Sequence, residues 1–171
     1  MQMNKVLLFH IDSCTGCGLC ESVCSLVHTR TTNPARSRIR VVREEPEGVY
    51  IPTFCQQCED APCIAACPTV AIGRNQLTGA IEVDRDLCAL CEQCIEACPF
   101  RGIYPDEIDQ VVIACDLCGG APNCVLFCET KALECLESDA AVAQKKQQAL
   151  QDWRERLSAV EEQFQSATKQ A

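Results

Sequence analysis

The chain has 171 residues, which is enough for one or two small domains. Its hydrophobic share of 47% includes 17 cysteines, so the other apolar side chains are few for a self-sufficient core of this length. Bound inorganic clusters can supply the missing folding free energy, because ligand binding adds to stability. The net charge of −9 argues against a nucleic-acid partner and favours another protein.

The first apolar run, 6–11, is short and ends at Asp12, without the charged start and cleavage site of a secretory signal. No stretch approaches the roughly 20 apolar residues of a membrane span. We therefore expect a cytoplasmic protein with no membrane span, whose cysteines bind metal more often than they form disulfides.

The predicted elements are short until the C-terminal tail. We expect a strand over 5–11, a hairpin of strands 37–42 and 49–54 joined by a turn at 44–48, and another short strand over 80–83. The end of each cysteine group is expected to begin a short helix. The tail from Ser138 to Ala171 lacks cysteine, glycine and proline, which predicts one long helix with Ser138 as its N-cap.

Sixteen of the cysteines form four groups of four. They are Cys14, Cys17, Cys20 and Cys24; Cys55, Cys58, Cys63 and Cys67; Cys88, Cys91, Cys94 and Cys98; and Cys115, Cys118, Cys124 and Cys128. Bacterial ferredoxins hold cubane clusters with the run C-x2-C-x2-C-x3-C-P, whose fourth cysteine binds the other cluster of a pair. The third group, with Pro99, matches this run fully, and the second ends in Pro68 with one gap widened. Gly16 and Gly18 let backbone amides approach a cluster in the first loop.

Structural zinc is the simplest alternative, because paired C-x2-C motifs also suit zinc. Zinc does not explain the regular third and fourth cysteines in all four groups, and disulfides explain the pattern less well still. His10 and His28 lie outside the pattern and are interpreted as ordinary structural or surface histidines. Cys135 also lies outside it and is interpreted as a small buried hydrophobe.

The four groups, in this order, resemble the four-cluster iron–sulfur subunits of the dimethyl sulfoxide reductase family over roughly Lys5 to Leu136. The segments 33–42 and 50–58 resemble its small cytoplasmic members. Those members serve tungsten-type aldehyde:ferredoxin oxidoreductases, formate hydrogenlyase and carbon monoxide dehydrogenase–hydrogenase systems, and the tungsten aldehyde oxidoreductase subunit is the most similar of these.

The resemblance implies an α+β fold of two bacterial-ferredoxin-like modules with a β-hairpin insertion and a long C-terminal helix. The four-cluster domain would span 1–137. Its outer module would be 1–30 plus 110–137, its inner module 52–109 and its hairpin linker 31–51. An amphipathic interaction helix would follow over 138–171.

The resemblance also implies four ligand sets, which we name A to D. Set A is Cys14, Cys17, Cys20 and Cys128; set B is Cys24, Cys115, Cys118 and Cys124; set C is Cys55, Cys58, Cys63 and Cys98; set D is Cys67, Cys88, Cys91 and Cys94. Each would bind one [4Fe–4S] cluster. In the outer module, Ser25 and Glu129 stand where prolines are expected.

The function implied is an electron relay that converts no substrate itself. Its expected partners are a catalytic tungsten- or molybdenum-containing subunit and a flavin/NAD or ferredoxin-type redox protein. The alternatives are a free, diffusible polyferredoxin and the relay subunit of a formate or carbon monoxide dehydrogenase–hydrogenase system.

Two surfaces are predicted to meet such partners. The arginines at 36, 38 and 40 alternate, which would place them on one face of a strand as a positive patch, although they could instead only offset cluster charge. The tail carries an apolar heptad row, from which we expect contact with a neighbouring subunit or a second copy of the chain, anchored by Trp153. The row is Leu150, Trp153, Leu157, Val160 and Phe164, extended by Ala143 and Ala167.

Overall fold

The computed structural model describes residues 5–44, 48–137 and 140–168, with backbone alone at 44, 140, 141, 157 and 159–168. The strands are β1 (Lys5–Phe9), β2 (Ile39–Glu44), β3 (Val49–Phe54), β4 (Ile72–Arg74), β5 (Ile81–Val83), β6 (Ile103–Asp106), β7 (Val111–Ala114) and β8 (Leu133–Glu137). The helices are α1 (Leu19–Thr29), α2 (Pro62–Ala65), α3 (Gln93–Glu96), α4 (Asn123–Leu126) and α5 (Ala140–Thr168). Short 3-10 turns are η1 (Ile11–Ser13), η2 (Pro34–Arg36) and η3 (Leu117–Gly120).

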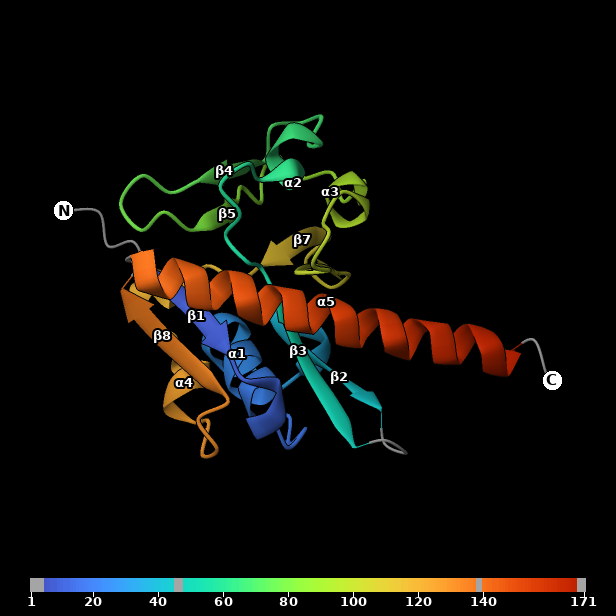
Figure 1. Ribbon diagram of the computed structural model, residues 1–171. Coiled ribbons are helices and arrows are strands. Elements are labelled where there is room, and N and C mark those ends of the chain that lie inside the picture. The colour runs from blue at the N-terminus through green and yellow to red at the C-terminus, as the bar shows by residue number, and fades with distance from the viewer. Residues whose placement is uncertain (1–4, 45–47, 138–139, 169–171) are drawn as a thin grey trace.

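The described strands pair as four separate two-stranded antiparallel sheets. Three of them, β2–β3, β4–β5 and β6–β7, join neighbours along the chain. The fourth pairs β1 with β8, so that Lys5 lies opposite Glu137 and Phe9 opposite Leu133. This pairing brings the first and fourth cysteine groups to one part of the molecule, while β4, β5, α2 and α3 gather in another (Figure 1).

The predicted hairpin is confirmed, with slightly different bounds. Its first strand begins at Ile39, because the Ser37 hydroxyl donates to the carbonyl oxygen of Ile39 and holds this stretch in a local turn. The N-terminal strand ends at Phe9, two residues earlier than expected, and Ile11 begins a 3-10 turn. The strand expected over 80–83 is β5, one residue shorter.

The apolar core is small and is built largely around the hairpin. Ile39, Ile51 and Phe54 are each 1% exposed. Phe9 of β1 meets Phe54 edge to face, with ring centroids 5.8 Å apart. Several cysteines belong to the same buried cluster, so the core and the cysteine sites are continuous.

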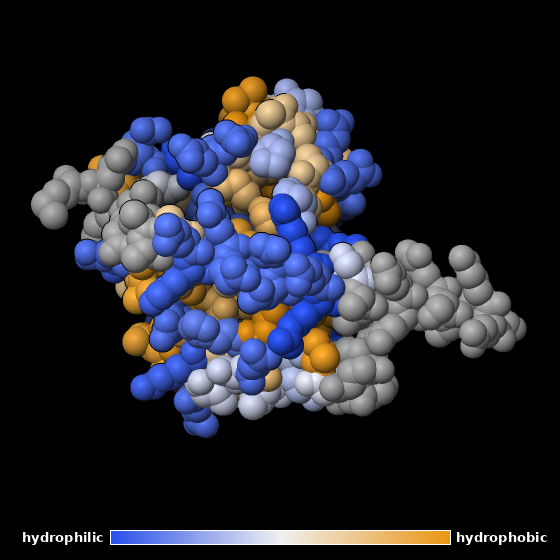
Figure 2. Space-filling view, in the orientation of Figure 1, coloured by the Kyte–Doolittle hydropathy of each residue, from blue (hydrophilic) through white to orange (hydrophobic). Residues whose placement is uncertain are grey.

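The long C-terminal helix is present as α5, but it packs on its own chain. Trp153 is 3% exposed and lies 5.7 Å from the Phe100 ring, and Arg156 pairs with Asp12 at 2.6 Å. Hydrophilic residues cover its outward face (Figure 2). The expectation that Trp153 anchors a neighbouring subunit is therefore wrong, because an apolar ring gains most where an apolar surface is already available.

Other expectations for the tail fall on residues that carry no description. Ser138 lies outside the described residues, as do the side chains of Leu157, Val160, Phe164 and Ala167. The last turns of α5 extend past the strands in Figure 1. No helix in the described part of the chain combines the length and apolar character needed to cross a membrane.

The arginines do not form a free positive patch. Arg36 lies in η2 and pairs with Asp106 at 2.8 Å, and Arg38 pairs with Asp116. Arg40 alone of the three lies on β2, with its guanidinium 4.2 Å from the Tyr104 ring centroid. The predicted docking patch is wrong, since these arginines fasten the hairpin segment to carboxylates and an aromatic ring of their own chain.

Candidate iron–sulfur sites

Each cysteine group ends in a helical segment that carries two cysteines four positions apart. The pairs are Cys20 and Cys24 in α1, Cys63 and Cys67 at α2, Cys94 and Cys98 at α3, and Cys124 and Cys128 at α4. Four residues advance about 6 Å along a helix axis. One short segment can therefore supply sulfurs to two adjacent sites.

The four thiols of set A line one small cavity of about 30 Å³. The β1–β8 pairing and the packing of α1 against α4 bring the loop after β1 up to Cys128. The hairpin covers this loop, since a Cβ added to Gly16 would lie 2.3 Å from the Tyr50 ring. Gly16 also has a φ of +68°, which glycine adopts without strain.

The four thiols of set D line a second small cavity, of about 10 Å³, together with Ile72 and Val112. Backbone amides point at two of its sulfurs. The N–H of Ala71 donates to Cys67 Sγ at 3.2 Å, and the N–H of Val112 donates to Cys88 Sγ at 3.4 Å. Such N–H···S bonds are one of the protein's means of setting a cluster's potential.

Sets C and B lie deeper, and their members are neighbours electrostatically. Burial raises the pKa of Cys55 to about 12, and the charges of the other three set C sulfurs add to the rise. Burial also raises the pKa of Cys124, and Cys24 and Cys118 of set B raise it further. The pKa of Cys115 is raised by burial and then by Cys124 and Cys24.

These four sets fit iron–sulfur clusters chemically. Free thiols crowded and buried in this way resist ionisation, because each thiolate would lie in a poorly solvated place beside other sulfurs. A bound metal reverses the balance and deprotonates its thiol ligands outright. Four sulfurs around one small space are also the donor set that cubane clusters use.

The turn after the fourth cysteine repeats in three of the four groups. The N–H three residues on donates to the cysteine's own carbonyl oxygen: Val70 to Cys67 and Arg101 to Cys98 at 3.3 Å, and Lys131 to Cys128 at 3.1 Å. All three donors have positive φ. Glu129 therefore replaces the expected proline without changing the turn. Ser25 differs, because it lets α1 continue to Thr29, where a proline would have ended it.

Gly102 is a second position where no side chain fits. A Cβ there would lie 2.4 Å from the carbonyl carbon of Phe54 and 2.5 Å from the backbone nitrogen of Cys55. We expect Gly102→Ala to push this backbone aside, to cost about 1–3 kcal/mol as overpacking does, and to reduce iron at set C. Gly73→Ala is the matched control, because open space surrounds Gly73.

Iron content and the melting temperature of anaerobically prepared protein measure both effects. An unchanged melting temperature and full iron in Gly102→Ala would contradict this packing. A loss of the same size in Gly73→Ala would show only that the chain tolerates no added methyl group.

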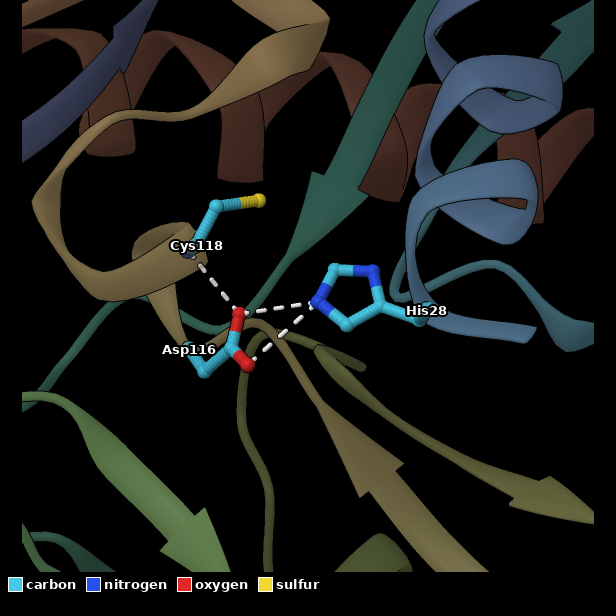
Figure 3. A group of neighbouring side chains, drawn as sticks. All are labelled: His28, Asp116 and Cys118. Atoms are coloured by element: carbon cyan, nitrogen blue, oxygen red, sulfur yellow. Dashed lines mark hydrogen bonds and ion pairs between the residues drawn. The ribbon is translucent and has the colours of Figure 1, made fainter. Parts of the chain in front are cut away.

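His28 has a structural partner that the sequence did not reveal. Its Nδ1 donates to the carbonyl oxygen of Cys24 at 2.8 Å, and its Nε2 donates to Asp116 at 3.1 Å. Burial alone would lower the pKa of His28, but hydrogen bonds to Asp116, Cys118 and Cys24 raise it to about 12. Figure 3 shows Asp116 between His28 and Cys118, whose N–H it accepts at 2.9 Å.

Asp116 is the residue at this site that sequence reasoning missed. Burial would raise its pKa, but the hydrogen bond from His28 and the charge of Arg38 hold that pKa below its usual range. The carboxylate therefore ties α1 and the hairpin segment to the set B loop. Its position directly after Cys115 was the available signal, since a charged side chain beside a buried ligand needs partners.

The remaining candidates are ordinary. His10 is exposed and lies 3.3 Å from Glu134. Cys135 is half-buried on β8 opposite Leu7, and burial raises the pKa of its thiol. Neither residue lines the cavities of set A or set D.

Comparison with known proteins points the same way. The chain is 41% identical over 131 residues to the polyferredoxin-like subunit of an aliphatic sulfonate oxidoreductase from Pyrococcus furiosus, covering 77% of this chain and 75% of that one. It is 35% identical to Protein NrfC of Escherichia coli K12, covering 74% of this chain but only 62% of that relative. It is 30% identical to formate hydrogenlyase subunit 2 of the same organism, covering 86% and 90%. Residues 46–138 match the family described as 4Fe-4S dicluster domain, and the chain belongs to this ferredoxin-like iron–sulfur family.

Proposed function

We propose that this protein is an iron–sulfur electron-transfer subunit that relays single electrons through four [4Fe–4S] clusters, one on each of sets A to D. The observation that carries the proposal is the convergence of sixteen cysteines into four sets, two of which line a cavity of their own. The clusters would supply the redox chemistry. The chain supplies thiolates, amide donors and a largely buried route.

The sets would be visited in the order A, B, C, D. Sets A and B share α1, which carries Cys20 for one and Cys24 for the other. Sets B and C are joined by Gln57, whose side-chain amide donates to the carbonyl oxygen of Cys115. Sets C and D share the α2 segment, with Cys63 and Cys67, and α2 packs on α3.

The two ends of this row are the places where electrons would enter and leave. Cys17 in set A and Cys91 in set D are exposed, whereas every cysteine of sets B and C is buried or half-buried. Exposed apolar side chains lie along the chain near each end: Leu19 and Phe127 near set A, and Val70 and Leu87 near set D. Such side chains mark surfaces where redox partners could dock.

The partner at one end would be a catalytic tungsten- or molybdenum-containing oxidoreductase subunit, with an aldehyde oxidoreductase as the first choice. A flavin/NAD or ferredoxin-type protein would serve the other end. Relatives named as a polyferredoxin-like subunit and as formate hydrogenlyase subunit 2 support a place in an enzyme complex over a free polyferredoxin, and they keep a formate system as the alternative.

Iron analysis tests the cluster count. Anaerobically prepared protein should contain about 16 Fe per chain, at four irons for each four thiolates. A value near eight, with half of the patterned cysteines open to alkylation, would show that two of the sets hold no cluster. Native mass spectrometry of the complex from its source organism would then identify the partner, and a chain that elutes alone would favour the diffusible carrier.

A further inference from the structure

Helix α5 lies against the loop that carries the first two cysteines of set C. The Lys146 ammonium donates to the carbonyl oxygen of Gln56, which lies between Cys55 and Cys58 in the sequence. Lys146 is half-buried and lines a cavity of about 530 Å³ together with Cys58 and Arg74. The helix therefore delivers a positive charge to one side of set C.

A second cation stands on the same side. The Arg74 guanidinium donates to the carbonyl oxygens of Cys58 and Gly79. Unlike Lys146, it belongs to β4, within the stretch that matches the dicluster family. Lys146 lies beyond residue 138, where that match ends, so its charge is an addition to the family's shared part.

The charge acts on the sulfurs themselves. Burial raises the pKa of Cys58, and the charge of Lys146 lowers it. In the other direction, burial lowers the pKa of Lys146, while the sulfurs of Cys58 and Cys55 raise it. Four thiolates around a cluster would leave excess negative charge here, which favours the protonated ammonium still more.

We propose that Lys146 on α5 tunes the cluster of set C by raising its reduction potential. Each electron that a cluster accepts adds negative charge, and a nearby cation stabilises that reduced form. Set C is the third position of the proposed row, so the C-terminal helix would set the driving force of a middle step rather than of entry or exit. The inference rests on the proposed function.

The test measures the four reduction potentials of the intact, cluster-loaded chain by redox titration followed by electron paramagnetic resonance. Lys146→Gln should make reduction of one cluster about tenfold less favourable, which is about 59 mV for a one-electron couple. The other three potentials should stay in place. Lys146→Arg, which keeps the charge, should restore the potential. Signals that vanish in Cys98→Ala identify the set C cluster.

Lys145→Gln is the matched control, because Lys145 is the exposed neighbour on the same helix and lines a different cavity. It should leave all four potentials unchanged. Four unchanged potentials in Lys146→Gln, with full iron, would overturn the inference and leave the relay intact. An equal shift of all four in both glutamine variants would also overturn it, since net charge alone would explain that result. A chain with too little iron for four clusters would instead refute the proposed function.

Should Lys146→Gln lose iron, Lys146→Met keeps the length of the alkyl stem and replaces it in the comparison. The potential must then follow the charge, low in the methionine variant and at its original value in the arginine variant. Equal potentials in these two variants would refute tuning by charge.

Discussion

Trp153→Ala is expected to destabilise the protein by about 3–5 kcal/mol, the usual cost of removing a large buried aromatic side chain. Trp153 is 3% exposed, and its ring lies 5.7 Å from Phe100. The guanidinium of Arg154 lies 4.8 Å from the centroid of the same Phe100 ring. Phe100 follows Cys98 by two residues, so the helix supports the segment that delivers the fourth sulfur of set C.

The melting temperature and the rate of cluster loss on mild heating measure this effect under anaerobic conditions. Gln144→Ala is the matched control, because it removes an exposed side chain from the same helix. Cutting the chain after Glu137 should act like the tryptophan variant, but more strongly. An unchanged melting temperature in Trp153→Ala, together with lost assembly into a larger complex, would return the helix to the role of an interface.

The sequence predicted α5 well but assigned its partner wrongly. A heptad spacing shows that an apolar row needs cover, and it does not say which surface supplies the cover. That surface here includes Phe100, which sequence separation alone does not connect with Trp153. The arginines failed for a similar reason, because Asp106 and Asp116 lie some 70 to 80 positions along the chain from their partners.

The cysteine spacing was more informative, because ligand geometry constrains it directly. Gaps of two and three residues were enough to predict the short helical segments at α2, α3 and α4. The contacts around the sulfurs were not predictable from spacing. The N–H of Arg38 reaches Cys24 Sγ at 3.3 Å, and Asp116 joins His28 to the set B loop, through long-range packing.

Cys98→Ala should remove the cluster of set C and spare that of set D, although Cys98 follows Cys94 in the same short segment. Cys98 contributes to the raised pKa of Cys55, Cys58 and Cys63, after burial in each case. The pKa of Cys94 is instead raised by burial and then by Cys67 and Cys88 of set D. We expect each variant to lose about four of roughly 16 irons, at four per cubane.

Cys94→Ala is the natural counterpart, since it lies one helical turn away and should remove the cluster of set D alone. Alkylation of the anaerobic protein, followed by peptide mass spectrometry, separates the two outcomes. In Cys98→Ala the reagent should label Cys55, Cys58 and Cys63 and leave Cys88 and Cys91 protected, and in Cys94→Ala the pattern should reverse. Labelling of Cys88 and Cys91 in Cys98→Ala would mean that each cysteine group binds its own cluster. The exchange of fourth sulfurs that links neighbouring sites in the row would then be absent from this chain.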